Sequence, residues 1–294
     1  MRRAPVVALV LALAAAVAGC GNEFDPASFV DKLRLLAVEA APPDLAPGQS
    51  TTLTATAVNP AGSAPTITWD ACLLPPPPAT GQAVNQDCIA LPEGDPLLVP
   101  FGQGASVPAT MPMLSPSMVG LPDQTNGVYL PVRVKLDADG GSLVAFYQLR
   151  IYLGALTPNA PNQNPSLTGI FLVPEADAGA AEQIPLDDTN PTPVQENYQL
   201  HLRALVTPES QEPYVVFDGD PRTTPPRMVT ETVRISWYAT AGRFSDDVTG
   251  VDKPDTTLIL DKHLPPSGTT IDLWVVARDE RGGSDVLHRA LLFE

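Results

Sequence analysis

The sequence predicts an all-β protein with two related domains in tandem behind an N-terminal leader. Apolar and polar residues alternate with a period of two in most segments, and no long stretch of the mature chain has the 3.6-residue period of a helix. Two short motifs recur in the same order in both halves. The length of 294 residues fits about two domains, and a hydrophobic content of 44% is too high for a disordered chain despite 34 prolines.

The N-terminal segment has the composition of a secretory signal. Arg2 and Arg3 precede an unbroken apolar run over residues 4–18, which is shorter than the roughly 20 residues that a membrane-spanning helix needs. Small residues then lead directly into Cys20. This ending resembles the lipobox of bacterial lipoproteins; the alternative is an ordinary cleaved signal with a coincidental cysteine. The resemblance implies cleavage of residues 1–19, a thioether lipid on Cys20 and acylation (palmitate) of the new amino terminus.

The mature chain is expected to reach the membrane only through this lipid. By the sorting rule of the family, Gly21 in place of Asp implies the outer membrane, with the periplasmic or surface face left open. Residues 20–31 would form the lipidated tether. Without Arg2 and Arg3 the 17 bases fall to 15 against 33 acids, so the net charge changes from −16 to −18. Such a chain is repelled by anionic lipid and by nucleic acid, and we expect no nucleic-acid partner.

Two recurring motifs indicate that the chain contains a repeat. Residues 67–71 read Ile-Thr-Trp-Asp-Ala, and residues 235–239 read Ile-Ser-Trp-Tyr-Ala. The pattern Asp-x-x-Gly-Gly-Ser stands at residues 137–142 and again at residues 279–284. Because each Gly-Gly motif follows an apolar, strand-like run in the same order, we interpret the two halves as a tandem of related domains.

The repeat sets the expected domain boundaries. Domain 1 covers residues 32–155 and domain 2 covers residues 166–294. Residues 156–165 are polar and rich in Pro and Asn, which is typical of a short, stiff linker that restrains domain motion. Domain 1 is longer between its two motifs because of a proline-rich insertion at residues 74–118. Proline cannot donate to a sheet ladder, so we expect most of this insertion to be loop or extended surface segment.

Alternating segments predict the strands of each domain. In such a segment apolar residues point to one face and polar residues to the other, the pattern of a half-buried strand. The clearest examples are residues 52–57, 66–71, 132–135 and 148–151 in domain 1 and residues 199–204, 232–237 and 271–278 in domain 2. The Gly-Gly motifs are predicted hairpin tips, because consecutive glycines supply positive φ. A short helical turn is expected at residues 176–182.

The two copies resemble the immunoglobulin-like β-sandwich domains of bacterial surface proteins. The matching features are Trp69 and Trp237, which correspond to the core tryptophan on the third strand of such folds, and the closing hairpin. The resemblance covers both copies and implies two immunoglobulin-like β-sandwiches, but it implies little about function. The sequence departs from antibody domains because no cysteine pair is placed to bridge the second and penultimate strands.

Cys72 and Cys88 are the two cysteines that remain besides Cys20. In an oxidising envelope an even pair predicts one disulfide. Closing a loop of about 17 residues would stabilise the fold by roughly 3 kcal/mol in the chain-entropy model. A redox or metal pair is the alternative, but it would need C-x-x-C spacing or a nearby histidine.

The chain carries no recognisable catalytic or nucleotide-binding motif, and its three histidines share no ligand spacing. We therefore predict no enzyme and no catalytic residue, with an envelope hydrolase as the alternative because catalytic sets are spatial. Paired acids are calcium candidates, since calcium prefers carboxylate oxygens, but such acids are also ordinary turn residues. The pairs are Asp137/Asp139, Asp187/Asp188, Asp218/Asp220 and Asp246/Asp247. No other cofactor is expected.

One face of domain 2 is a candidate binding surface. Trp274 and Tyr238 lie on the phase opposite the apolar residues of their strands. In an immunoglobulin-like sheet these strands are neighbours, which brings both aromatics together with Arg234 and Arg278 on an outer face. Aromatic residues and Arg are enriched at binding hot spots. The alternative is that domain 1 or residues 208–230 cover this face.

These observations predict a lipid-anchored binding or scaffolding protein of the cell envelope without catalytic activity. Its partner would be an envelope protein, or a glycan if the chain is a surface adhesin.

Overall fold

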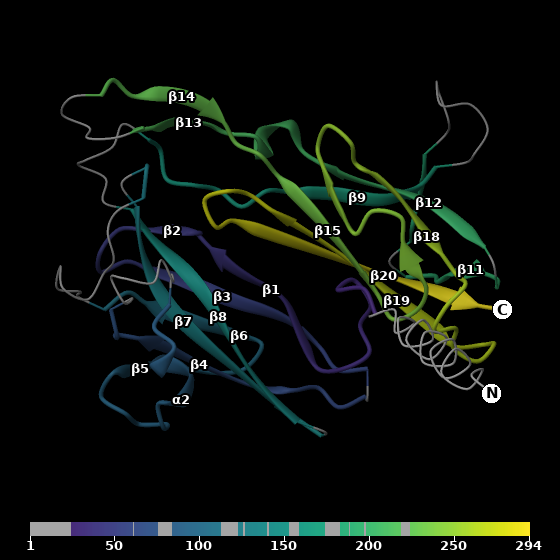
Figure 1. Ribbon diagram of the computed structural model, residues 1–294, viewed down its shortest axis with the longest axis horizontal. Coiled ribbons are helices and arrows are strands. Elements are labelled where there is room, and N and C mark those ends of the chain that lie inside the picture. The colour runs from purple at the N-terminus through teal and green to yellow at the C-terminus, as the bar shows by residue number, and fades with distance from the viewer. Residues whose placement is uncertain are drawn as a thin grey trace, which may run out of the picture.

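The computed structural model describes residues 25–60, 62–75, 84–112, 123–125, 127–139, 141–152, 159–173, 183–187, 189–196, 198–218 and 224–294 (Figure 1). The predicted signal peptide, Cys20 and the predicted helical turn at residues 176–182 lie outside this part. Helix is rare in the described residues, where α2 (Asp87–Ala90) and the 3-10 turn η2 (Pro208–Ser210) are the helical elements. None of the described helices has the length and apolar character that crossing a membrane requires.

Domain 1 is a sandwich of a three-stranded and a five-stranded sheet. The first sheet has the order β1 (Arg34–Ala41), β3 (Ser50–Val58) and β6 (Ser106–Thr110). The second has the order β2 (Asp44–Leu45), β8 (Gly141–Tyr152), β7 (Gly127–Ala138), β4 (Thr66–Cys72) and β5 (Leu98–Gln103). Neighbouring strands are antiparallel except for β2, which runs parallel to β8.

Domain 2 repeats this plan with two five-stranded sheets. One has the order β10 (Ile184–Pro185), β9 (Leu167–Leu172), β12 (Gln199–Val206), β18 (Asp255–Ile259) and β16 (Arg243–Phe244). The other has the order β11 (Thr192–Val194), β20 (Ser284–Phe293), β19 (Thr270–Arg278), β15 (Arg234–Ala239) and β17 (Val248–Gly250). A separate hairpin, β13 (Pro213–Val216) with β14 (Arg227–Thr230), extends from this domain (Figure 1).

The strand orders identify both domains as immunoglobulin-like. In domain 2, β9, β12, β18 and β16 form one sheet and β15, β19 and β20 the other, which is the four-plus-three arrangement of the constant-type immunoglobulin sandwich. In domain 1, β1, β3 and β6 replace β9, β12 and β18, while β4, β7 and β8 replace β15, β19 and β20. Each domain also adds a short parallel strand, β2 or β11, to its last strand. The predicted tandem of immunoglobulin-like domains is confirmed.

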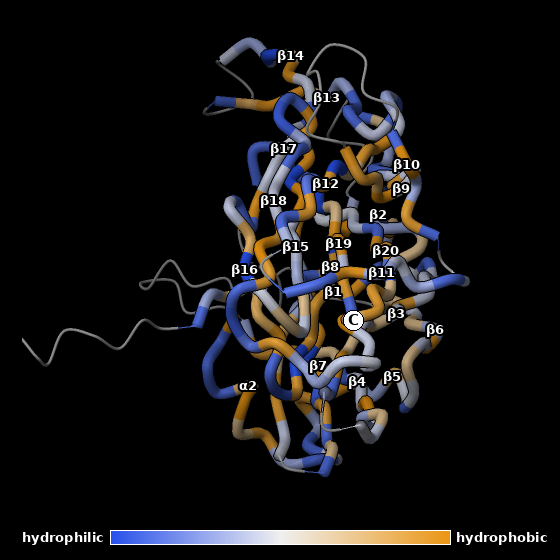
Figure 2. The backbone as a smooth tube through the Cα atoms, turned by 90° about the vertical axis from the view of Figure 1, so that its right-hand side faces the viewer, coloured by the Kyte–Doolittle hydropathy of each residue, from blue (hydrophilic) through white to orange (hydrophobic). Residues whose placement is uncertain are grey.

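Each sandwich is built around its tryptophan, as predicted. Trp69 on β4 and Trp237 on β15 are fully buried, and each is the largest side chain in its core. The indole N–H of Trp69 donates to the Gly104 carbonyl (2.8 Å), and that of Trp237 donates to the Thr249 hydroxyl (2.9 Å). Apolar residues fill the interior of both domains, while hydrophilic residues gather in the loops (Figure 2).

The proline-rich insertion contributes two edge strands. Residues 98–110 supply one extended strand to each sheet of domain 1, at the edge of that sheet. Pro100 and Pro108 are tolerated because β5 and β6 are both edge strands, where a missing amide donor need not break a ladder. Residues 76–83 and 113–118 of the insertion lie outside the described part.

The predicted disulfide joins Cys72 at the end of β4 to Cys88 in α2. Both cysteines are buried beside Leu98, and Phe146 of β8 packs against the same cluster. The bridge therefore holds the first half of the insertion against the outer face of the five-stranded sheet.

A buried ion pair fixes the same segment from another side. Arg133 of β7 donates to Asp70 of β4 (2.9 Å) and to the Leu91 carbonyl that follows α2 (2.7 Å). Arg133 is buried although it lies on the polar phase of its strand, because the insertion covers this face.

Both Gly-Gly motifs form hairpin tips, as predicted, but the tips differ in length. Ala138 pairs with Gly141, which leaves a two-residue tip between β7 and β8. Arg278 pairs with Ser284, so residues 279–283 form a longer tip between β19 and β20. This longer tip reaches domain 1, as described next.

Candidate functional site between the two domains

Two linker asparagines tie the domains together. Asn162 donates from its backbone to Asp44 of domain 1 (2.8 Å) and from its side chain to Asp279 of domain 2 (2.9 Å). Asn164 accepts a hydrogen bond from the backbone of Ser284 (3.1 Å). Because Asn162 is only 2% exposed, these bonds form away from water. The linker is thus a fixed joint between the domains.

Side chains of the linker and of domain 2 also cap the free edge of β1. An edge strand directs alternate carbonyls away from its sheet, where they need partners if they are buried. Three such carbonyls each accept one side-chain hydrogen bond: Leu36 from Arg278, Val38 from Ser284 (2.7 Å) and Ala40 from Asn164 (2.9 Å). The first strand of domain 1 is therefore held along its length by the rest of the chain.

The segment before β1 is bound to domain 2. Residues 28–30 make backbone hydrogen bonds of 2.9 and 3.0 Å with Ala239, at the end of β15. The ring of Phe29 stacks on His263 at 3.9 Å, and His263 Nε2 lies 2.8 Å from the Asp25 carboxylate. The part of the predicted tether that the structure describes is consequently a strap across domain 2.

The predicted aromatic surface of domain 2 is buried. Trp274 is only 7% exposed and packs in a cluster with Val30, Leu36 and Ala37. Alternation placed Trp274 on the outer face of its sheet, but the first strand of domain 1 and the preceding strap cover that face. The prediction that Trp274 belongs to an open binding surface is therefore wrong, and the alternative that domain 1 packs there is correct.

The other three residues of that surface serve the same interface or lie beside it. Tyr238 is half-buried, with the Arg34 guanidinium 5.8 Å from its ring centre. Arg278 donates to the Leu36 carbonyl across the domain boundary. Arg234 is exposed on β15. Tyr238 and Arg278 therefore belong to the joint between the domains, while Arg234 remains at the surface.

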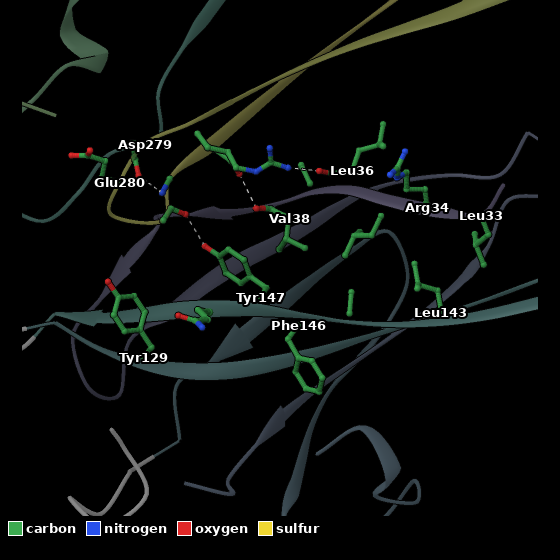
Figure 3. A pocket seen from close by; sticks show the side chains of 18 of the residues that line it. Leu33, Arg34, Leu36, Val38, Tyr129, Leu143, Phe146, Tyr147, Asp279 and Glu280 are labelled. Carbon is green, nitrogen blue, oxygen red and sulfur yellow. Dashed lines mark hydrogen bonds between the residues drawn. The ribbon is translucent and has the colours of Figure 1, made fainter. Parts of the chain in front are cut away.

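A groove of about 710 Å³ lies beside this joint, along the open side of domain 1 (Figure 3). It runs between β1 and β8, and the tip between β19 and β20 forms part of its rim. Its apolar lining comes from both strands: Leu33, Leu35, Val38, Leu143, Ala145 and Phe146. Tyr129, Tyr147 and Gln148 add polar groups. An apolar cleft of this volume with a few polar groups is the usual form of a ligand site.

The two ends of the groove carry opposite charges. Arg34 lies at the end where Leu33 and Leu143 meet, and Lys32 adjoins them in the chain (Figure 3). Asp279 and Glu280 lie at the other end (Figure 3). A ligand that spans the groove thus meets a basic end and an acidic end.

Tyr147 joins the groove to domain 2. Its hydroxyl donates to the Gly282 carbonyl (3.1 Å), across the domain boundary. Burial raises the pKa of Tyr147 above its usual value, and the nearby carboxylates of Asp279 and Asp44 raise it further. The hydroxyl consequently keeps its proton at neutral pH and remains a hydrogen-bond donor.

A buried arginine belongs to the network that fixes Tyr129 in the groove wall. Arg150 of β8 is 2% exposed and donates to Asp44 (2.6 Å), while Asp123 lies 3.5 Å away. Tyr129 at the groove wall donates to Asp123 (2.7 Å). Burial acts to raise the pKa of Asp123, but hydrogen bonds from Tyr129 and Thr125 outweigh it and lower that pKa. The network fixes the ring of Tyr129.

A second buried cation holds the rim. Arg281 in the tip between β19 and β20 donates to Glu231 (3.0 Å) and to Glu212. Its guanidinium lies 4.9 Å from the ring centre of Tyr214 on β13. Burial raises the pKa of Glu231 to about 7, although the hydrogen bond from Arg281 opposes this. The hairpin of β13 and β14 is thereby fixed to the groove rim.

Several of the acids considered as calcium ligands have other partners. Asp137 lies 3.1 Å from Lys135, Asp218 accepts from Arg227 (3.0 Å), and Asp187 accepts from the Thr189 backbone (2.7 Å). The described residues contain no group of three or more His, Cys, Asp or Glu that could hold a metal ion. Asp188 and Asp220 lie outside the described part.

Sequence reasoning did not single out the groove. Alternation distinguishes the two faces of a strand, whereas the groove lies along strand edges and uses residues of both phases of β8. One available signal was the run Leu35-Leu36-Ala37-Val38, which is apolar on both phases and therefore indicates a strand covered on two sides.

Comparison with known proteins adds no functional assignment. No family model and no curated protein sequence matches the chain. Among solved structures, the Ig1-2 module of the Drosophila receptor protein tyrosine phosphatase DLAR is 12% identical, with a TM-score of 0.25, and the match covers 90% of this chain and 99% of that one. Three N-terminal domains of the outer capsid protein Hoc of bacteriophage RB49 are 13% identical, with a TM-score of 0.21 and coverage of 89% and 59%. Likenesses this low carry no argument, and the fold assignment rests on the strand orders.

Proposed function

We propose that this chain is a lipid-anchored, non-catalytic binding protein of the cell envelope whose ligand lies in the groove of domain 1 beside the joint with domain 2. The observation that carries the proposal is the groove itself, which has an apolar lining, polar groups at its rim and the volume of a ligand site. The capped edge of β1 and the fixed linker hold its walls in place. A preformed site loses less ordering entropy on binding, which favours affinity.

The position of the strap supports the anchoring half of the proposal. Cys20 precedes Asp25 by five residues, which span at most about 18 Å when fully extended. Because the chain contacts domain 2 from Asp25 onward, a lipid on Cys20 would hold domain 2 close to the membrane surface. The outer membrane remains the proposed location.

The alternatives of an adhesin and a hydrolase gain no support from the site. The glycan-binding alternative depended on Trp274 and Tyr238, which the first strand of domain 1 covers. The described residues that line the groove include no His or Cys, and its Ser284 hydroxyl donates to the Val38 carbonyl. We therefore propose binding without catalysis.

The anchoring half is tested by Cys20→Ala in the natural host. We expect the variant to lose incorporation of labelled palmitate and to appear as uncleaved precursor or as protein released from the membrane fraction. Unchanged mass and unchanged membrane partitioning of the variant would refute the lipid anchor.

The binding half is tested by filling the groove. Ala145→Leu places a larger side chain on the β8 wall, and Val248→Leu on the exposed strand β17 is the matched control. Both variants and the parent chain are screened against a displayed library of random linear 12-residue peptides and against a glycan array. Binding that Ala145→Leu weakens at least tenfold, with the control unchanged, supports the groove. Binding that both variants retain would exclude it.

A further inference from the structure

The edge of β8 beside the groove has no strand partner in the described part of the chain. β2 pairs with β8 only at Arg150 and Ile151. Among the described residues, no backbone hydrogen bond reaches residues 141–149 of β8 from any strand except β7. Half of the amides and carbonyls in this stretch are therefore available for a further strand.

The register identifies the groups that point outward. Ala138 and Gly141 close a two-residue tip, so they form a hydrogen-bonded pair, and such pairs alternate along an antiparallel ladder. Leu143, Ala145 and Tyr147 consequently bond to β7. The backbone N–H and C=O groups of Ser142, Val144, Phe146 and Gln148 point away from β7.

This edge lacks the devices that usually protect a free edge. Residues 142–149 read Ser-Leu-Val-Ala-Phe-Tyr-Gln-Leu, with no charge and no proline, and the ladder to β7 has no bulge. Natural proteins block free edges with charged residues, prolines or bulges, or cover them, because an apolar edge of this length is a template for strand pairing. Such an edge can accept a further strand.

Two comparable edges in the described part of the chain are both blocked. β1, across the groove, has three outward carbonyls capped by side chains. β20, which corresponds to β8 in domain 2, carries Asp285 and Arg289 along its edge. Asp285 accepts from the Leu167 backbone (2.7 Å), and Arg289 donates to the Leu186 carbonyl (2.8 Å). Only β8, among these three described edges, is left open.

The groove has room for one extended segment. Leu143, the small Ala145 and Tyr147 direct their side chains toward the interior of domain 1, since their partners on β7 are core residues. They leave an apolar floor for alternate side chains of an added strand. The tip that contains Gly282 contacts Tyr147, so domain 2 limits the space beside this end of β8.

We propose that the groove takes an extended segment of a partner polypeptide, which adds as a strand to β8. This rests on the proposed function and names its ligand class. Main-chain hydrogen bonds to Val144, Phe146 and Gln148 would supply affinity, and the apolar floor would select alternate apolar side chains. The charged ends favour a segment with an acidic residue beside Arg34 and a basic residue beside Glu280.

The test uses peptides enriched from the same 12-residue library on the full mature chain. Val144→Pro removes one outward amide without touching a bond to β7, and proline is tolerated at strand edges. Val144→Ala is the matched control, because it loses the side chain but keeps the amide. Gln148→Pro and Gln148→Ala form a second pair in case one proline variant fails to fold, which thermal unfolding reports.

We expect each proline variant to bind at least tenfold more weakly than its alanine partner. Amide hydrogen exchange should show that bound peptide protects Val144, Phe146 and Gln148, while Leu143 and Ala145 are protected already in the free chain. These results together support strand addition.

The other outcomes separate the two proposals. If Ala145→Leu blocks binding while both proline variants bind like the parent, the groove is a ligand site but strand addition is wrong. If only glycans bind in the groove, or if the library yields no peptide, the polypeptide ligand is wrong. A stable symmetric dimer of the mature chain that Val144→Pro disrupts would identify a second copy as the occupant and overturn the proposal.

Discussion

The two domains share a strand order but close their open sides differently. In domain 2 a long connection between β9 and β11 brings Leu186 to the side where the two sheets meet. Leu186 donates from its backbone to Ile170 of β9 (2.8 Å) and accepts from Arg289 of β20 (2.8 Å), so it bridges both sheets. In domain 1 the corresponding connection is only Pro42 and Pro43, and nothing equivalent reaches between β1 and β8 in the described residues.

This difference explains why the groove belongs to domain 1. In this fold the first and last strands lie in different sheets, which leaves an open side between them. A domain can cover that side with its own chain or leave it free for a ligand. Domain 2 covers it with its own chain. Domain 1 leaves it open toward domain 2, which supplies the rim and fixes the facing strand. The tandem arrangement thus creates a site that neither sandwich has alone.

The largest expected effect tests whether the two cores are equivalent. Trp69→Ala and Trp237→Ala each remove a fully buried side chain and leave a cavity, so each should lower the free energy of unfolding by about 3–5 kcal/mol. Denaturant unfolding followed by domain-resolved hydrogen exchange measures the loss in each domain. Tyr198→Ala, at a 52% exposed position, is the control and should change little. A loss below about 1 kcal/mol in either domain would show that its core is not built on tryptophan.

The next change should lower the stability of domain 1 but not that of domain 2. Replacing both Cys72 and Cys88 by Ala removes the cross-link of domain 1, whose cysteines are 16 residues apart, and should cost about 3 kcal/mol in the chain-entropy model. Domain 2 contains no cysteine and should keep its stability. Reductant added to the parent chain should reproduce the change. Equal destabilisation of both domains would mean that they unfold as one unit.

A smaller effect addresses the open side directly. Leu186→Ala should cost about 2–3 kcal/mol, because Leu186 is 3% exposed and its loss leaves a cavity between the sheets of domain 2. Ala145→Leu adds the same atoms to the open side of domain 1, where the groove has room, and should not destabilise it by more than about 1 kcal/mol. Chemical denaturation of both variants measures the two changes in unfolding free energy. A large loss for Ala145→Leu would show that domain 1 is already closed.

The sequence was sufficient for what depends on local pattern. Period-two alternation located the strands, the repeated motifs located the two domains, and the spacing and compartment of Cys72 and Cys88 led to the correct disulfide. Proline content indicated loop or extended surface segment for residues 98–110, but it did not show that they pair as strands, because the sequence does not show which segments lie at sheet edges. Edge strands tolerate the prolines that a central strand would exclude.

The candidate site could not be predicted because it depends on how two domains pack. Trp274 was assigned correctly to the outer face of its sheet, but no local pattern shows that β1 of domain 1 covers that face. The groove depends in the same way on the length of one connection and on contacts between residues more than 100 positions apart, such as Tyr147 with Gly282. These are properties of the tertiary structure.

The last expected effect compares the buried ion networks of the two domains by pH. Near Arg150 in domain 1, the lowered pKa of Asp123 gives stability that is present above its ordinary value of 3.8 and is lost as pH falls below it. Near Arg281 in domain 2, Glu231 has its pKa raised from 4.5 to about 7. The folded state then holds a proton that the unfolded state releases, so domain 2 should lose stability as pH rises from 4.5 to 7. The slope of one proton is at most about 1.4 kcal/mol per pH unit.

Between pH 4.5 and 7 we therefore expect the stability of domain 2 to decline. Domain 1 should decline as well, because burial and the Asp285 carboxylate raise the pKa of Glu39 on β1, but that part of the response does not depend on Glu231. Glu231→Gln removes the titrating proton but keeps an oxygen that can accept from Arg281, so it should flatten the decline in domain 2. Exposed Glu209→Gln is the matched control and should leave the slope unchanged. Denaturant midpoints measured across this pH range give both slopes. If Glu231→Gln keeps the slope of the parent chain, another acid controls the pH response, and the rim of the groove is not held by a carboxyl that titrates near neutrality.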